Sequence, residues 1–139
     1  MQLSLRLCGT YSAKDAALMN ALQLAYIGDA VWETVVRDMM IHRGMSVRHM
    51  HSACVRHVNA HAQACFLHQL TDLLDEQEQE IARRGRNAHA HHAAPKNQDP
   101  GDYAASTGFE ALIGFLFLTG RDERILQLAE ILIGGNEDG

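Results

Sequence analysis

Two acidic residues interrupt apolar helical sequence at positions where core packing favours no charge. Asp29 continues a stripe of apolar residues spaced as on one helix face, formed by Leu18, Leu22 and Ala25. Glu110 breaks a second apolar run. Burial of an unpaired carboxylate is costly, so each side chain needs a cation, a hydrogen-bonding partner or access to water. Each acid is therefore either a capped or salt-bridged core residue, or one of a pair that holds a hard divalent ion between packed helices.

Histidines offer a second possible metal chemistry. His57 and His61 have i, i+4 spacing in helix-like sequence, and His89, His91 and His92 lie close together. No cysteine stands at zinc-ligand spacing from either group. Other histidines are scattered around the predicted helix that holds His57 and His61, as expected of a polar surface. We therefore favour surface histidines over a zinc site.

Hydrophobic periodicity predicts an all-α protein of about five helices that position these side chains. The predicted helices cover residues 15–43, 46–69, 71–85, 103–119 and 122–133. Gly28 is a weak point of the first helix, and Ser46 and Thr71 are the expected N-caps of the second and third. On the second helix, Cys54 and Cys65 are assigned to the apolar side. The segment 86–101 holds both prolines and few apolar residues, which predicts a long surface loop.

Length and composition favour one domain over residues 1–139, with a core of about 15–133 and frayed ends. The formal net charge of −5 excludes nucleic-acid binding through a pervasive positive field, so any such contact must be local. The three cysteines show no CxxC spacing and are interpreted as reduced thiols. No leader-like or membrane-spanning stretch is evident, so we expect a soluble, cytoplasmic protein without membrane contact.

The two acidic segments and the sequence between them resemble a known family. Residues 25–33 read AYIGDAVWE and residues 109–114 read FEALIG, and each resembles one acidic motif of the ribonuclease III family. Between them lie RRGRNA at 83–88 and PKN at 95–97, followed by Tyr103, Ser106 and Thr107. The order and spacing over about residues 18–128 resemble Mini-ribonuclease III, the form of the family that has only the catalytic domain.

This resemblance implies the ribonuclease III catalytic fold as a symmetric homodimer, with Asp29 and Glu110 as catalytic, metal-binding acids. Mg²⁺ and its bound water would cleave double-stranded RNA and leave 5′-phosphate and 3′-hydroxyl ends. The implied natural substrate is precursor large-subunit (23S) ribosomal RNA. The family's dimer contact falls near Tyr26, Ile27 and Trp32, which are also plausible core residues.

The segment between the motifs carries the only local concentration of positive charge. Its cations and amides are Arg83, Arg84, Arg86, Asn87, Lys96 and Asn97. Such donors suit A-form RNA, which proteins recognise through shape, phosphates and 2′-hydroxyls, and phosphate contacts make binding salt-dependent. Arg83 and Arg84 would also complement the C-terminal end of a helix with acidic first turns.

The match to the family is incomplete. Larger ribonuclease III enzymes have further acids at the places of Leu22, Ala25 and Thr107, which leaves the number of metal ions open. Glu33 either helps to position the ion or is a solvated charge. Two other functions remain: an inactive RNA-binding or ribosome-associated dimer of the same fold, and a zinc- or histidine-dependent interaction module.

Overall fold

The computed structural model describes residues 6–88 and 94–134. Its elements are α1 (Ala13–Ala17), α2 (Ala21–His42), α3 (Val47–Val58), α4 (Ala60–Leu70), the 3-10 turn η1 (Thr71–Leu73), α5 (Glu76–Asn87), α6 (Pro100–Leu118) and α7 (Asp122–Ile133). The described residues contain no strand, which confirms the predicted all-α class. No helix in the described ranges is both long and apolar enough to cross a membrane.

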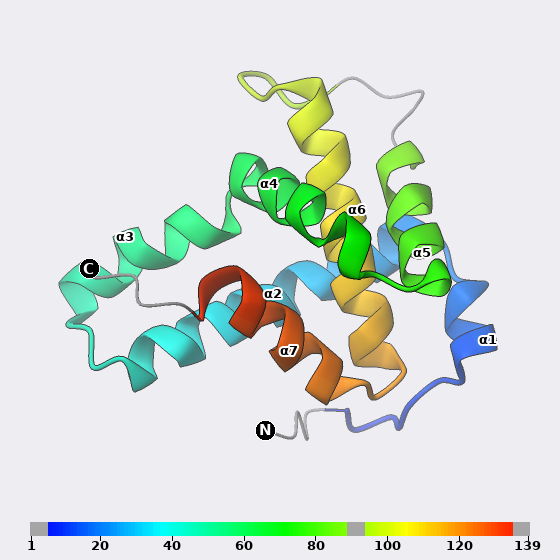
Figure 1. Ribbon diagram of the computed structural model, residues 1–139, viewed down its shortest axis with the longest axis horizontal. Helices are drawn as coiled ribbons and strands as arrows, with labels where there is room; N and C mark the ends of the chain where they lie inside the picture. The colour runs from blue at the N-terminus through cyan, green and yellow to red at the C-terminus, as the bar shows by residue number, and fades with distance from the viewer. Residues whose placement is uncertain (1–5, 89–93, 135–139) are drawn as a thin grey trace.

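Helix α6 is the centre of the molecule. It packs against α2, α4 and α5, and Figure 1 shows it running between them. Every residue from Ser106 to Phe117 except Glu110 is buried. A helix that is apolar on all sides needs neighbours on all sides, which explains why the other helices surround α6.

Three aromatic rings join the core side of α2, α4 and α6. The Trp32 ring meets Phe109 edge-on, with centroids 4.9 Å apart, and Phe66 completes the cluster at 5.8 Å from both. The indole Nε1 of Trp32 donates a 2.8 Å hydrogen bond to the backbone oxygen of His57. Trp32 is fully buried, so its polar atom is satisfied inside one chain.

Glycines allow α2 and α6 to approach until their backbones touch. A Cβ atom on Gly28 would lie 1.8 Å from the backbone oxygen of Glu110, and one on Gly114 would lie 1.8 Å from that of Leu24. No side chain fits at either position. Gly28 is therefore a packing requirement inside an unbroken helix, and not the weak point that periodicity predicts.

The predicted helix over 15–43 is wrong at residues 18–20, where the chain turns between α1 and α2. The Asn20 side chain caps α2 by accepting a 2.8 Å hydrogen bond from the Leu22 backbone nitrogen. Arg84 on α5 donates to the backbone oxygens of Ala17 and Met19. A distant arginine thus satisfies carbonyls that a continuous helix would have used.

The predicted helix over 46–69 is wrong at Asn59, which ends α3 and begins α4. Asn59 has extended backbone (φ −75°, ψ 161°); its side chain donates to Val55 O at 2.9 Å and accepts from Ala62 N at 2.8 Å. The break rotates the second half of the segment. Cys65, assigned to the apolar side, is exposed, whereas Gln63 is buried.

The third predicted helix is displaced in the sequence. Thr71 begins the turn η1, and Asp75 is the true N-cap of α5, in a reciprocal capping box with Glu78. Gly85 does not end α5, because the helix continues to Asn87 while Gly85 packs closely on Gly108 of α6. The predicted loop over 86–101 is correspondingly shorter. The described chain has seven α-helices where about five were predicted.

Substitution Gly114→Ala should destabilise the protein strongly, because the new methyl group must push α6 away from α2. Overpacking of this kind costs about 3 kcal/mol or more of unfolding free energy. Urea unfolding monitored by circular dichroism measures this loss of unfolding free energy.

Gly101→Ala is the matched control, in the first turn of α6. There the only atom near the new Cβ is the Asp99 carboxylate oxygen at 3.1 Å, and we expect a change within about 1 kcal/mol. Equal effects at both positions would show that the close crossing does not limit stability.

Candidate active site

The close crossing of α2 and α6 brings Asp29 and Glu110 together. Gly28, which touches the Glu110 backbone, directly precedes Asp29. The two carboxyl groups are hydrogen-bonded: the protonated Glu110 group donates to the Asp29 carboxylate. Asp29 is exposed and Glu110 is partly buried. The pair therefore lies where the helix crossing opens to solvent.

Burial and negative neighbours raise the pKa of Glu110 to about 8. Loss of solvation is the largest cause, followed by the hydrogen bond to Asp29, which holds the neutral acid, and by the charge of Asp29. The charge of Glu33 adds to the rise. Near neutral pH and without a cation, the pair retains a proton. A divalent cation would replace that proton, since it stabilises both carboxylates at once.

Gln63 of α4 is a residue of this site that sequence analysis missed. It is 1% exposed, and its amide opposes part of the pKa rise of Glu110. Its Nε2 nonetheless makes no hydrogen bond of normal geometry within the described residues. A buried amide without a full partner is unusual and suggests a ligand position. Its signal in the sequence was a polar residue in line with Phe66, Leu67 and Leu70, hidden because the break at Asn59 was not predicted.

Glu33 lies one turn beyond Asp29, where it pairs with a surface arginine and also affects the acid pair. It is partly exposed and lies 3.8 Å from Arg37 in a weak surface ion pair. Its charge also reaches Glu110. Of the three positions where larger relatives carry acids, Leu22 is exposed and Ala25 and Thr107 are buried. The Thr107 hydroxyl donates to Tyr103 O in its own helix. The acidic pair is thus not extended from those positions.

The basic residues do not act as one cluster. Arg84 donates to the α1 carbonyls and holds that helix in place. Arg83 forms two hydrogen bonds to Glu80, at 2.6 and 2.9 Å. Within the described ranges no ion pair engages Arg86 or Lys96. Asn87 and Asn97 are exposed, and a shallow hollow of about 370 Å³ lies beside Asn87.

His57 and His61, whose spacing offered a possible metal pair, do not lie together in the structure. His57 is buried at the end of α3 and stacks on Phe66, whereas His61 is exposed on α4, because the break at Asn59 separates them. Among described residues, no group of three or more histidine, cysteine or acidic side chains could hold a metal ion. The histidines at 89, 91 and 92 lie outside the described residues.

The three residues named as a dimer contact have different surroundings. Tyr26 is 86% exposed, Ile27 is partly buried and Trp32 is fully buried. Trp32 therefore has no surface to offer a second chain and is a core residue. Leu22, one turn before Tyr26 on α2, is also exposed, as is Leu18 at the end of α1.

The raised pKa of Glu110 makes the stability of the metal-free protein depend on pH. The folded chain binds this proton more tightly than the unfolded chain, whose pKa is near 4.5. The resulting stabilisation is complete below about pH 4.5 and is lost as the pH rises through 8. The free energy of unfolding, measured with urea in EDTA, should fall over this range by up to about 5 kcal/mol.

Glu110→Gln should flatten that profile and stabilise the protein at pH 8, because the neutral amide has no proton to lose. Glu123→Gln, at an exposed position of α7, is the control and should follow the wild type. If the unfolding free energies of Glu110→Gln and of the wild type decrease equally with pH, Glu110 is not the group that titrates.

Comparisons with known proteins agree with this architecture. The family model "Ribonuclease III domain" matches residues 22–121. The Mini-ribonuclease 3 of Symbiobacterium thermophilum is 51% identical over 110 residues, which cover 78% of this chain and 84% of the relative. That of Desulfitobacterium hafniense is 42% identical, over 87% of this chain and 78% of the relative.

A solved structure has the same fold. The crystal structure of a Fusobacterium nucleatum protein superposes with a TM-score of 0.76 at 28% identity, and the match covers 84% of this chain and 94% of that one. The segment that matches the ribonuclease III family model contains both Asp29 and Glu110. The chain therefore belongs to the ribonuclease III family, with Mini-ribonuclease 3 proteins among its relatives, and it is an endoribonuclease.

Proposed function

We propose that this endoribonuclease cleaves double-stranded RNA with Mg²⁺ held by Asp29 and Glu110. The observation that carries the proposal is the hydrogen-bonded carboxyl pair at the α2–α6 crossing, which retains a proton without a cation. Two carboxylates suit Mg²⁺, which commonly binds one or two protein acids and keeps several waters. The buried amide of Gln63 adds a polar group at the same place.

The residues of this site have separable tasks. Asp29 and Glu110 release their shared proton and present carboxylate oxygens from two helices whose spacing the glycines fix. Gln63 offers its amide to Glu110 from the core side. Mg²⁺, when bound, supplies an activated water and neutralises charge on the phosphodiester. The expected products have 5′-phosphate and 3′-hydroxyl ends.

RNA contact is assigned to the exposed donors at the end of α5 and the start of the following segment. Arg86, Asn87, Lys96 and Asn97 are exposed. Arg83 joins them only if phosphate replaces Glu80 as its partner, and Arg84 serves α1 instead. So few phosphate contacts in an acidic chain imply modest affinity that falls with salt.

The protein acts as a symmetric homodimer in this proposal. Leu22 and Tyr26 form a short stripe of exposed apolar residues on α2, which ends one turn before Asp29, and Leu18 is exposed at the end of α1. Self-association along this stripe would bury them and bring two sites near a two-fold axis, one for each RNA strand. Ile27 borders the stripe.

By family resemblance the natural substrate is a helical stem of precursor 23S ribosomal RNA in the cytoplasm. The main alternative is a dimer of the same fold that binds RNA or a ribosomal partner without cleaving it. That alternative does not require an acid pair in contact, so the pairing of Asp29 with Glu110 favours the enzyme.

Cleavage of a long duplex RNA tests the assignment of the acids. With Mg²⁺ the wild type should cut and leave 5′-phosphates, and EDTA should abolish cutting. Asp29→Asn and Glu110→Gln should each lower the rate at least about a hundredfold, because each removes one ligand charge.

Asp38→Asn, a substitution of another α2 acid, is the matched control and should cut at the wild-type rate. Gel mobility separates binding from cleavage. If the wild type binds the duplex but does not cut it in Mg²⁺, the enzyme proposal fails and the inactive dimer replaces it.

The dimer is tested by sedimentation of Tyr26→Lys. A lysine in the apolar stripe should shift the protein toward monomer, since a charge would otherwise be buried at the interface. Val47→Lys changes an equally apolar residue, 83% exposed on α3, and should leave the dimer intact. A wild type that sediments as a monomer at micromolar concentration contradicts the proposal.

A further inference from the structure

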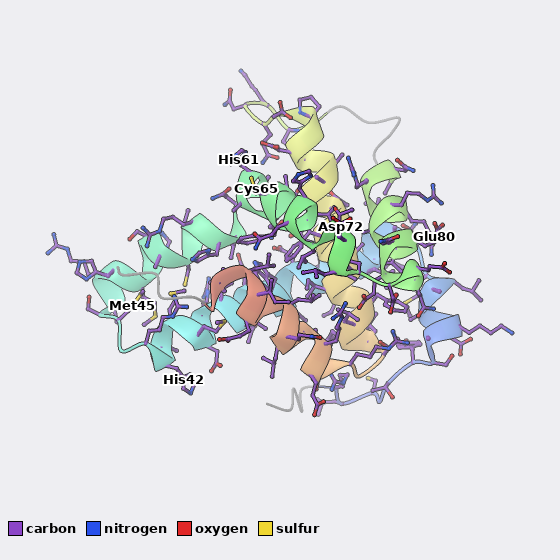
Figure 2. The ribbon with its side chains drawn as sticks, viewed as in Figure 1. His42, Met45, His61, Cys65, Asp72 and Glu80 are labelled. Atoms are coloured by element: carbon purple, nitrogen blue, oxygen red, sulfur yellow. The ribbon has the colours of Figure 1, made fainter. Side chains whose placement is uncertain are left out.

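The three cysteines of this chain have different surroundings. Cys54 is buried, whereas Cys8 and Cys65 are exposed. Cys65 lies on α4 one turn after His61, and its Sγ is 3.7 Å from the His61 Nε2. Figure 2 shows both side chains near the beginning of α4. A histidine nitrogen within hydrogen-bonding reach of an exposed thiol is the first requirement for activating that thiol.

His61 is itself held by an acid from another helix. Its Nδ1 lies 2.9 Å from Oδ2 of Asp102, in the first turn of α6. Asp102 is fixed at the start of that helix, where its backbone nitrogen donates to the N-cap Asp99 at 2.9 Å. The positive end of the helix dipole favours a carboxylate there. When Nδ1–H donates to Asp102, the free lone pair of His61 is on Nε2 and faces Cys65.

We propose that Cys65, His61 and Asp102 form a reactive-thiol site that exchanges with low-molecular-weight disulfides. Cys65 is the nucleophile, His61 is the general base and Asp102 is a positioning residue that acts through His61. Acyl transfer by such a triad would also need preorganised donors for an oxyanion. Disulfide exchange needs only an accessible sulfur and a proton acceptor, and both are present.

The exchange balances without any further reactant. The Cys65 sulfur attacks one sulfur of the disulfide R–S–S–R as its proton passes to Nε2 of His61. The new bond is Cys65–S–S–R, and the R–S–S–R bond breaks to release R–S⁻. His61 then returns the proton to the released thiolate, giving R–SH. The Cys65 sulfur is oxidised, the leaving sulfur is reduced, and an excess of small thiol reverses the reaction.

This site is separate from the proposed nuclease site, although both use α4 and α6. Gln63 lies between His61 and Cys65 in sequence but is buried and faces Glu110. Residues two apart in a helix point about 200° apart, so the two sites use opposite sides of α4. Thiol exchange at Cys65 therefore does not depend on the proposed nuclease chemistry.

The test is the reaction of the native full-length protein with 4,4′-dithiodipyridine, with the modified cysteine identified by peptide mass spectrometry over time. Cys8 is the internal reference, because it is exposed in the same chain. Cys54 is buried, so its modification would show that the protein had unfolded. General-base assistance predicts that Cys65 reacts at least about tenfold faster than Cys8. Cys54 should stay unmodified until denaturant is added.

Three variants separate a positioning role from a structural one. His61→Gln should reduce the Cys65 rate to that of Cys8. Asp102→Asn, which keeps an oxygen that can accept from Nδ1, should give an intermediate rate, and Asp102→Ala should match His61→Gln. In all three, Cys54 should remain protected. Equal rates at Cys65 and Cys8 in the wild type, or a rate ratio unchanged by His61→Gln, would overturn the proposal.

Discussion

The backbone contact between α2 and α6 is the constraint on which the rest of the structure depends. Two glycines, one on each helix, let the two helix backbones approach so closely that a Cβ atom on either glycine would overlap a carbonyl oxygen of the other helix. Asp29 directly follows Gly28, and Gly28 lies against the backbone carbonyl of Glu110 on α6. Loss of the close approach would therefore separate the acids as well as weaken the core. The contact between Gly28 and the Glu110 backbone thus serves both the packing of the core and the position of the acid pair.

The electrostatics of the acid pair follow from this geometry. A carboxyl group that is partly buried beside another carboxylate keeps its proton to about pH 8. Such a pair is costly for the metal-free fold and becomes favourable with a divalent cation. Elsewhere the charges are used locally: Arg124 joins the buried Glu78 of α5 to α7 at 2.8 Å, and Arg84 joins α5 to α1. Several arginines of this acidic chain thus serve its own fold before any ligand.

Local signals in the sequence were sufficient for the helices but not for their breaks. Period and composition predicted the all-α class, a central helix over 103–119 that the structure has at Pro100–Leu118, and the last helix at Asp122–Ile133. The breaks at residues 18–20 and at Asn59 have no proline or glycine to mark them. They are stabilised by partners that only folding supplies, namely Arg84 for the first and a side chain that caps two helices for the second. Gln63 was missed because its position on a face depends on the second break.

The sequence by itself determined the family and the helical class and predicted the pair of acids, because residue types at short spacing carry this information. Tertiary structure decided which of the named side chains are available. It placed Trp32 in the core, engaged Arg84 with α1, and separated His57 from His61. It also joined His61 to Asp102, 41 residues away. Contacts between residues far apart in the chain leave no periodic signal, so only the packing of the helices could reveal them.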